Sequence, residues 1–369
     1  MLVYHVISDG EVGGAGIFLS RLLPCLASLG VSSKVILPKG SKLLPVLREA
    51  SIPLLFAGRS DTAFAFADLI FFFRMLRKES PDLVLSHGSL SVKGAAALRR
   101  IPLVTVKHCD LPVAHPRLYN RLTDATVATS YPCACHLKNQ GVSSVYCIEN
   151  GTCATTPPSA ESRRAARATL GIAEGTLAIG LCGRLSAVKG QETALRALSA
   201  LADEEKRIRL LFLGEGEEEA RLRALSLSLG LEDQVSFLGY TPKTAPFYAA
   251  CDVHLSCSLS SETSSLSLAE GMCAALPTVA SATEGNLSRV GDGGLFYPPG
   301  DASALAACLR RLFDANEREK WKTAALCRAA ALPTWEETAN KYRALFERVT
   351  EGRKKKGGNG CNFEETMLQ

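Results

Sequence analysis

The chain has 369 residues, of which 47% are hydrophobic and 21% are charged, and its formal net charge is +5 at pH 7. This length exceeds what one ordinary hydrophobic core holds, so we expect two domains of a soluble, globular type. No basic stripe interleaved with aromatic residues is present, which argues against nucleic acid as a partner.

Short β-rich runs alternate with helical patterns along the chain, in two series. In the first series we predict strands at 3–8, 34–37, 54–56, 83–86, 103–107, 125–128 and 145–148, with helices between them that include 16–29, 66–78 and 92–100. In the second series we predict strands at 178–181, 209–212, 235–237, 253–256, 278–280 and 295–297, with helices that include 192–201, 217–229 and 303–313. Such alternation is typical of a parallel sheet covered by helices on both faces. We therefore predict an α/β fold with two tandem doubly wound, Rossmann-like domains facing a cleft.

The alternation lapses between residues 150 and 162, where Gly, Thr and Pro157-Pro158 are typical of a linker. We place the first domain at residues 1–155 and the second at 156–333. Residues 334–350 predict a last amphipathic helix that packs back on the first domain. Residues 351–369 combine a run of Arg and Lys with Gly and Asn, a composition that we interpret as a disordered basic tail.

A glycine-rich segment, with Gly13, Gly14 and Gly16, follows the first predicted strand. Glycine lets the backbone approach a ligand closely and exposes N–H groups. The segment does not fit a dinucleotide-binding fingerprint, because the third glycine is missing and the next strand ends without an acid for the ribose. NAD is therefore not expected.

Two histidines stand at the ends of strands in the first series: His87 in Ser86-His87-Gly88, and His108 just after the strand that ends at Lys107. A lone histidine is usually structural, but two at corresponding strand ends favour a place in the cleft. No Gly-x-Ser-x-Gly nucleophile elbow is present, and no acid is placed in the sequence to orient either histidine.

In the second series, Gly183-Arg184 and Lys189-Gly190 lie between a strand and a helix. A bidentate Arg and a mobile Lys suit a diphosphate, although two ordinary surface cations explain the same residues. The sequence has no Asp-x-Asp pair to hold a divalent cation on that diphosphate. We therefore expect no metal and no cofactor.

Glu262 and Glu270 stand eight positions apart, and the residues between them predict a polar turn that leads into a helix. Free N–H groups at a helix N-terminus favour an anion, so two flanking carboxylates suit a diphosphate with a polyol at each end. A capping box at Ser267-x-x-Glu270 with a solvated Glu262 explains the same residues. Both interpretations stay open on the local pattern.

Taken in order, these motifs resemble those of the retaining glycosyltransferases of family four, which have the glycosyltransferase B fold. The resemblance covers most of residues 1–350. It rests on Gly13-Gly14, Ser86-His87-Gly88, His108, Asn150-Gly151, Gly183-Arg184 with Lys189-Gly190, and the Glu262 to Glu270 segment. It implies an acceptor-side first domain and a second domain that binds the nucleotide sugar.

The resemblance also implies a role for each candidate residue. The expected catalytic residues are His108 beside the reacting centre, Glu262 on the transferred sugar, and Arg184 and Lys189 on the diphosphate. The expected donor-binding residues are Gly13, Gly14, Arg184, Lys189, Gly239, Tyr240, Glu262, Ser265, Leu266 and Glu270. Among these, Glu270 binds the ribose, Ser265 and Leu266 offer N–H groups to the diphosphate, and Gly239 and Tyr240 meet the base.

The implied activity is retaining, metal-independent transfer of a sugar from a nucleotide-sugar donor to a glycan or lipid-linked acceptor in polysaccharide or lipopolysaccharide biosynthesis. We expect a UDP-sugar as the donor. The alternatives are a phosphorylase or hydrolase on the same fold, or a non-catalytic protein that binds a nucleotide or sugar. The chain departs from the family pattern at Thr263-Ser264-Ser265 and at Glu284, which concerns the choice of donor sugar more than the class of reaction.

The sequence also carries signals that bear on the cellular location of the protein. The most apolar run, residues 63–73, is too short to span a bilayer, and no secretory signal pattern opens the chain. The aromatic and basic residues of the predicted helix 66–78 suit either peripheral membrane contact or packing on the sheet. The 13 cysteines are scattered and fit free thiols. We expect a cytoplasmic protein, or one at the inner face of the cell membrane.

Overall fold

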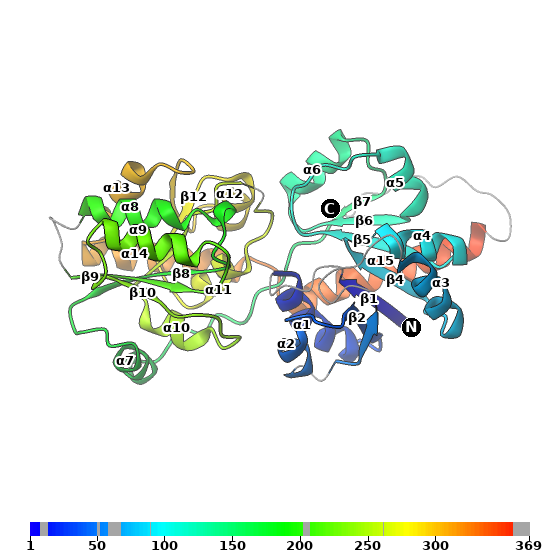
Figure 1. The fold of residues 1–369 in the computed structure, drawn as a ribbon, viewed down its shortest axis with the longest axis horizontal. Helices are drawn as coiled ribbons and strands as arrows, with labels where there is room; N and C mark the ends of the chain where they lie inside the picture. The colour runs from blue at the N-terminus through cyan, green and yellow to red at the C-terminus, as the bar shows by residue number, and fades with distance from the viewer. Residues whose placement is uncertain are drawn as a thin grey trace.

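The computed structural model describes residues 1–7, 14–49, 52–57, 68–88, 90–201, 207–260 and 262–356. These residues form two parallel sheets, each flanked by helices, in two lobes (Figure 1). All thirteen predicted strands are present among the described residues, each within two residues of the predicted ends.

The first sheet has the strand order β3-β2-β1-β4-β5-β6-β7. Its strands are β1 (Leu2–Ile7), β2 (Ser32–Pro38), β3 (Leu54–Ala57), β4 (Leu83–His87), β5 (Leu103–Lys107), β6 (Ala125–Ala128) and β7 (Val145–Cys147). Its helices are α1 (Gly14–Ser28), α2 (Leu44–Glu49), α3 (Leu69–Lys78), α4 (Leu90–Arg99), α5 (Pro116–Leu122) and α6 (Tyr131–Asn139). The strand order reverses between β1 and β4, where Ile7 pairs with His87. In such sheets a ligand binds where the order reverses, beyond the carboxyl ends of the strands.

The second sheet has the order β10-β9-β8-β11-β12-β13 and reverses between β8 and β11. Its strands are β8 (Leu177–Cys182), β9 (Ile208–Leu213), β10 (Val235–Phe237), β11 (Val253–Ser256), β12 (Thr278–Ser281) and β13 (Gly294–Tyr297). Its helices are α7 (Ala160–Thr169), the 3₁₀ turn η2 (Ala187–Lys189), α8 (Gln191–Leu201), α9 (Glu219–Ser228), α10 (Ala245–Ala250), α11 (Leu266–Cys273), α12 (Glu284–Val290), α13 (Ala302–Arg311) and α14 (Ala315–Ala330).

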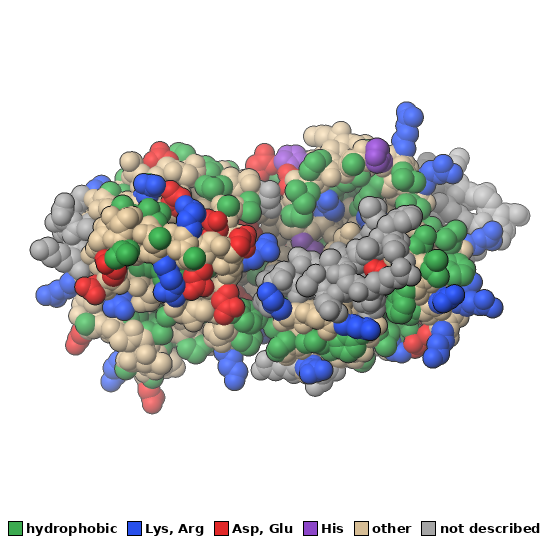
Figure 2. All heavy atoms as spheres, in the orientation of Figure 1, with side chains coloured by type: hydrophobic (Ala, Val, Ile, Leu, Met, Phe, Trp, Pro, Cys, Tyr) green, Lys and Arg blue, Asp and Glu red, His purple; other side chains and the backbone are tan. Residues whose placement is uncertain are grey.

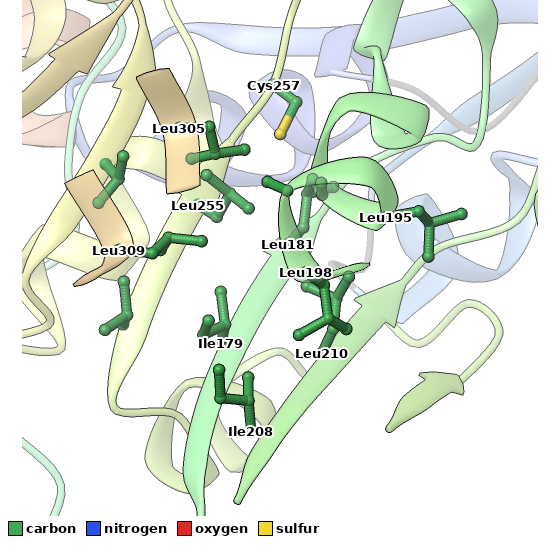
Figure 3. Packing of buried hydrophobic residues seen from close by; sticks show 14 of the residues in the cluster. Ile179, Leu181, Leu195, Leu198, Ile208, Leu210, Leu255, Cys257, Leu305 and Leu309 are labelled. Atoms are coloured by element: carbon green, nitrogen blue, oxygen red, sulfur yellow. The ribbon is translucent and has the colours of Figure 1, made fainter. Parts of the chain in front are cut away.

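The strands are hydrophobic on both faces because helices cover both. In β8, Ile179 and Leu181 point into one buried cluster, whereas Ala178 belongs to the cluster on the opposite face. Figure 3 shows the first of these clusters, in which strand residues pack against α8 and α13. Its labelled members are Ile179, Leu181, Leu195, Leu198, Ile208, Leu210, Leu255, Cys257, Leu305 and Leu309. This packing holds the strand ends, and so the loops beyond them, in fixed positions.

The last helix, α15 (Trp335–Lys356), packs against α1 of the first lobe; Figure 1 shows it in orange to red among the blue and cyan elements. Trp335, Tyr342 and Phe346 lie in the same buried cluster as residues of β1 and α1. The helix continues past the predicted end at residue 350, so the predicted basic tail from residue 351 is wrong for residues 351–356. The physical reason is a fork of charged hydrogen bonds, since Arg353 donates to both carboxylate oxygens of Asp124 at 2.7 and 2.9 Å. Residues 357–369 lie outside the described residues.

The chain passes between the lobes twice, at residues 150–152 and 333–335, and the two passages lie side by side. The N–H of Thr152 donates to the carbonyl of Pro333 at 2.8 Å, and Thr152 pairs with Thr334 in a parallel bridge. A Cβ added at Gly151 would lie 2.6 Å from Cα of Trp335. The close passage therefore requires glycine at this position.

We predict that Gly151→Ala lowers the melting temperature, because the added methyl group must displace the backbone of Trp335, a cost of about 1–3 kcal/mol. The matched control is Gly94→Ala in α4, where the new Cβ meets only the end of the Leu69 side chain, at 3.0 Å. Thermal unfolding followed by circular dichroism compares the two variants. An equal or smaller loss in Gly151→Ala than in Gly94→Ala would contradict the packing argument.

Candidate active site

The centre of the site is an ion pair between two loops of the second sheet. Lys189 Nζ contacts Glu262 Oε2, and the same oxygen accepts a hydrogen bond from Ser258 Oγ at 2.9 Å. Lys189 closes the turn after β8, and Glu262 lies in the loop after β11, so both come from the carboxyl ends of the two strands at which the order reverses. The Leu259 N–H also donates to the carbonyl of Val188 at 2.8 Å, which joins the two loops.

Arg184 follows β8 in the same loop and is exposed. Its carbonyl accepts a hydrogen bond from Gln191 Nε2 at 2.8 Å, which fixes the backbone of the loop. Within the described part of the chain, the Arg184 guanidinium has no acidic partner. This side chain is therefore available to an anion that reaches the end of β8.

Ser265 and Leu266 stand at the N-terminus of α11. Ser265 is the N-cap, and its Oγ accepts a hydrogen bond from the N–H of Leu268 at 3.4 Å. The capping-box alternative for Ser267 and Glu270 is therefore wrong, because the helix begins at Leu266 and Glu270 is already its fifth residue. The first N–H groups of α11 emerge in the loop that carries Glu262, and such groups favour an anion.

Glu270 lies near Tyr248 of α10 and Arg21 of α1. Thr244 Oγ1 donates to Glu270 Oε2 at 3.2 Å. Burial raises the pKa of Glu270, and a hydrogen bond with Tyr248, the charge of Arg21 and the Thr244 hydroxyl offset this only in part. The carboxylate is thus held in a partly desolvated state, ready for hydroxyl donors from a ligand.

The Glu262 loop also touches the first lobe. Thr263 Oγ1 donates to the carbonyl of His108 at 2.8 Å and lies 2.9 Å from Thr129 Oγ1. Glu262 and Cys109 form an antiparallel bridge, and Asn150 Nδ2 donates to the carbonyl of Ser264 at 3.2 Å. These contacts join the His108 backbone of the first lobe to the loop that carries Glu262.

The His108 ring is half-buried and in contact with other aromatic rings. Its Nε2 lies 2.8 Å from Nδ1 of His87, and the Phe18 ring meets it edge-on with centroids 5.0 Å apart. Burial lowers the pKa of His108 to about 4, so the imidazole is neutral near pH 7.

Three further candidates lie outside this cluster. Gly239 follows β10 with φ of +70°, and its carbonyl accepts from the Gly214 N–H at 2.8 Å. The N–H of Tyr240 donates to Glu215 Oε1 at 3.3 Å. Gly14 is exposed at the start of α1. Gly13 lies outside the described residues.

The sequence did not identify Ser258, Thr129 or Thr244 as part of the site. It did mark Thr263 and Glu284 as departures from the family pattern, and both prove to be contacts between the lobes. Glu284 Oε2 lies 3.1 Å from Nε2 of His136, whose Nδ1 contacts Asp110. The hydrogen bond and negative charge of Asp110, and to a smaller extent the charge of Glu284, raise the pKa of His136.

Two doubly wound parallel domains whose strand ends meet at this cluster define the glycosyltransferase B fold. The structure is similar to the crystal structure of Anabaena HepE in complex with UDP and glucose, with a TM-score of 0.82 and 21% identity over 94% of this chain and 99% of that one. At this identity the similarity establishes the fold alone.

The sequence comparisons establish the family. Residues 12–154 match the family model described as Glycosyltransferase Family 4, and residues 162–326 match the one described as Glycosyl transferases group 1. The chain belongs to this family of glycosyltransferases.

Two relatives illustrate the similarity. The chain is 30% identical to the D-inositol 3-phosphate glycosyltransferase of Stackebrandtia nassauensis, over 52% of this chain and 47% of the relative. It is 32% identical to the lipopolysaccharide core biosynthesis glycosyltransferase LpsE of Rhizobium meliloti, over 36% of this chain and 38% of the relative. Both matches span less than half of the relative's length.

We predict that Glu270→Gln stabilises the ligand-free protein increasingly as pH rises. The raised pKa means that the folded state holds the Glu270 proton more tightly than the unfolded state, so ionisation lowers the free energy of unfolding above the usual carboxyl range. Neutral Gln avoids this cost. The melting temperature of the variant minus that of the wild type should therefore grow as the pH rises above the usual carboxyl range.

The control is Glu319→Gln, an acid whose side chain is 68% exposed. It should show no such trend in differential scanning fluorimetry. If the difference in melting temperature between Glu270→Gln and the wild type falls with rising pH, the raised pKa of Glu270 is refuted.

Proposed function

We propose that the protein is a retaining, metal-independent glycosyltransferase that moves a sugar from a UDP-sugar to a glycan or lipid-linked acceptor in surface polysaccharide or lipopolysaccharide synthesis. The observation that carries the proposal is the Lys189–Glu262 pair at the carboxyl ends of β8 and β11, held against His108 by Thr263. Family membership and the fold support the class of reaction. The choice of UDP is supported by HepE, whose structure holds UDP and glucose.

In the proposed donor complex, the ion pair opens, and Lys189 and Glu262 each bind a part of the substrate instead. Lys189 and Arg184 bind the diphosphate together with the N–H groups that begin α11. Glu262 accepts hydrogen bonds from hydroxyls of the transferred sugar, and Glu270 accepts them from the ribose. The positive charge gathered at the diphosphate stabilises the leaving group as the glycosidic bond breaks.

The proposed transfer takes place on one face of the sugar. The bond between the anomeric carbon and the diphosphate oxygen breaks, and the acceptor oxygen bonds to the same face of that carbon. The acceptor proton passes to the departing diphosphate, so no protein base is needed. Metal independence follows from the same arrangement, because two cations and a helix N-terminus neutralise the leaving group.

We predict that Lys189→Ala and Glu262→Gln each lower kcat/KM for sugar transfer by about 100-fold or more, the usual effect of removing one group that stabilises the transition state. Lys322→Ala, which alters a lysine on α14 whose side chain is 41% exposed, should leave transfer unchanged. The measurement is UDP release from a panel of nucleotide sugars with lipid-linked and glycan acceptors, in the presence of EDTA.

The products decide between the candidate reactions. UDP release that requires an acceptor supports the transferase. Dependence on inorganic phosphate would identify a phosphorylase, and release without any acceptor would identify a hydrolase. Full activity of Lys189→Ala would contradict the assignment of the site.

We also propose that the first lobe contacts an anionic membrane surface through α3. One face of this helix is buried through Phe72 and Leu76, whereas Ile70 and Phe71 are 62% and 41% exposed on the other. Arg74, Arg77 and Lys78 are exposed on that same side. Figure 2 shows hydrophobic side chains bordered by Lys and Arg where Figure 1 places α3 and α4.

Such a face suits the interface of an anionic bilayer, with apolar side chains among the acyl chains and cations at the headgroups. Within the described residues, no helix is both long and apolar enough to cross a membrane. The proposed contact is peripheral, and the predicted location stays the cytoplasm or the inner face of the cell membrane.

We predict that the protein co-sediments with phosphatidylglycerol vesicles and that Ile70→Ser with Phe71→Ser weakens this binding by at least about tenfold, since burying one such side chain contributes about 1.5–3 kcal/mol. Leu227→Ser, which alters an exposed residue of α9 in the second lobe, is the matched control. Equal binding to neutral phosphatidylcholine vesicles, or an equal loss in the control, would contradict the proposal.

A further inference from the structure

Three histidines form a column inside the first lobe. His5 of β1 stacks on His87 of β4 with ring centroids 6.4 Å apart, and His87 stacks on His108 at 5.1 Å. His5 is fully buried and His87 is 9% exposed. Burial lowers the pKa of His5 to about 3 and that of His87 well below its usual value. Each ring therefore carries a single proton near neutral pH.

The contact between His87 Nδ1 and His108 Nε2, at 2.8 Å, needs one donor and one acceptor. Two arrangements satisfy it. In the first, His87 donates from Nδ1, and the proton of His108 sits on Nδ1. In the second, His108 donates from Nε2, and the proton of His87 sits on Nε2.

The surroundings of His87 distinguish these arrangements. His87 Nε2 is buried and has no hydrogen-bond partner among the described residues. The second arrangement places an N–H at this position, and buried N–H groups without an acceptor are rarer in proteins than acceptors without a donor. The first arrangement leaves only a bare nitrogen there and is favoured.

We propose that His87 is a positioning residue that donates from Nδ1 to His108 Nε2 and so fixes the proton of His108 on Nδ1. Because Nε2 is occupied by His87, Nδ1 is the ring nitrogen of His108 that remains for a ligand. The substrate role rests on the proposed function, whereas the tautomer itself does not.

The consequence is that His108 meets the substrate as a hydrogen-bond donor, with a hydroxyl or ring oxygen of the sugar as the matching acceptor. It takes no proton during the reaction, and its own proton stays on Nδ1. This agrees with the proposed transfer, in which the acceptor proton leaves with the diphosphate.

The first test is the tautomer of the wild-type protein. Long-range ¹H–¹⁵N correlation spectra of the ¹⁵N-histidine-labelled protein report which ring nitrogen carries hydrogen, and His87→Asn and His108→Asn identify the two signals. The expected result is hydrogen on Nδ1 of both rings. Hydrogen on Nε2 of His108 would overturn the proposal whatever the activity.

The second test is a pair of variants of nearly equal size. Asn at position 87 presents an N–H donor near the place of Nδ1, whereas Asp presents only acceptors. We expect His87→Asn to keep kcat within about threefold of the wild type and His87→Asp to lower kcat by about 100-fold, with little change in donor KM.

The carboxylate of Asp should also favour the charged imidazole, so His87→Asp should give a pH–rate profile with a higher apparent pKa for His108. Equal losses in both folded variants would show a merely structural role and overturn the proposal. If the wild type shows the expected tautomer but transfers no sugar, the proposed function fails while the positioning role stands. If His87→Asp does not fold, the wild-type spectrum decides.

Discussion

The ion pair between Lys189 and Glu262 is the interaction on which the rest of the site depends. The two side chains are 33% and 15% exposed, so neither charge would be well solvated alone. In the ligand-free protein each side chain neutralises the charge of the other, and the Ser258 hydroxyl donates a further hydrogen bond to the Glu262 carboxylate. In the proposed donor complex, a nucleotide sugar offers both substitutes at once, a diphosphate for the lysine and hydroxyls for the carboxylate. Donor binding as we propose it replaces one set of interactions by another and leaves neither charge unpaired.

The loop that carries Glu262 also joins the two lobes. The proposed donor recognition and the arrangement of the two domains therefore depend on the same residues. The Thr263 hydroxyl reaches the His108 carbonyl and Thr129, and a glycine at this position would make neither contact. Any rotation of one lobe against the other must break these bonds or move Glu262 with them. The departure from the family's glycine-rich turn is thus explained by a structural task, the attachment of the loop that carries Glu262 to the first lobe.

The strands could be predicted because buried parallel strands are continuous hydrophobic runs, and their order along the chain placed Arg184, Lys189, Glu262 and His108 at strand ends. The helices that were not predicted by residue range include the short α2, α5 and α6, whose few turns carry little periodic signal, and also the longer α7 and α14. The capping box was wrong because local spacing does not show where a helix begins. Contacts such as Thr263 with His108, 155 positions apart, depend on how the two sheets face each other, which no local pattern encodes.

The central claim is that Glu262 and the donor diphosphate compete for Lys189. Isothermal titration calorimetry of UDP, which lacks the transferred sugar that would engage Glu262, tests it directly. Glu262→Ala frees Lys189, so the account predicts that this variant binds UDP more tightly than the wild type by about two- to fivefold, the size of a partly exposed ion pair. Unchanged or weaker UDP binding by Glu262→Ala would contradict the account.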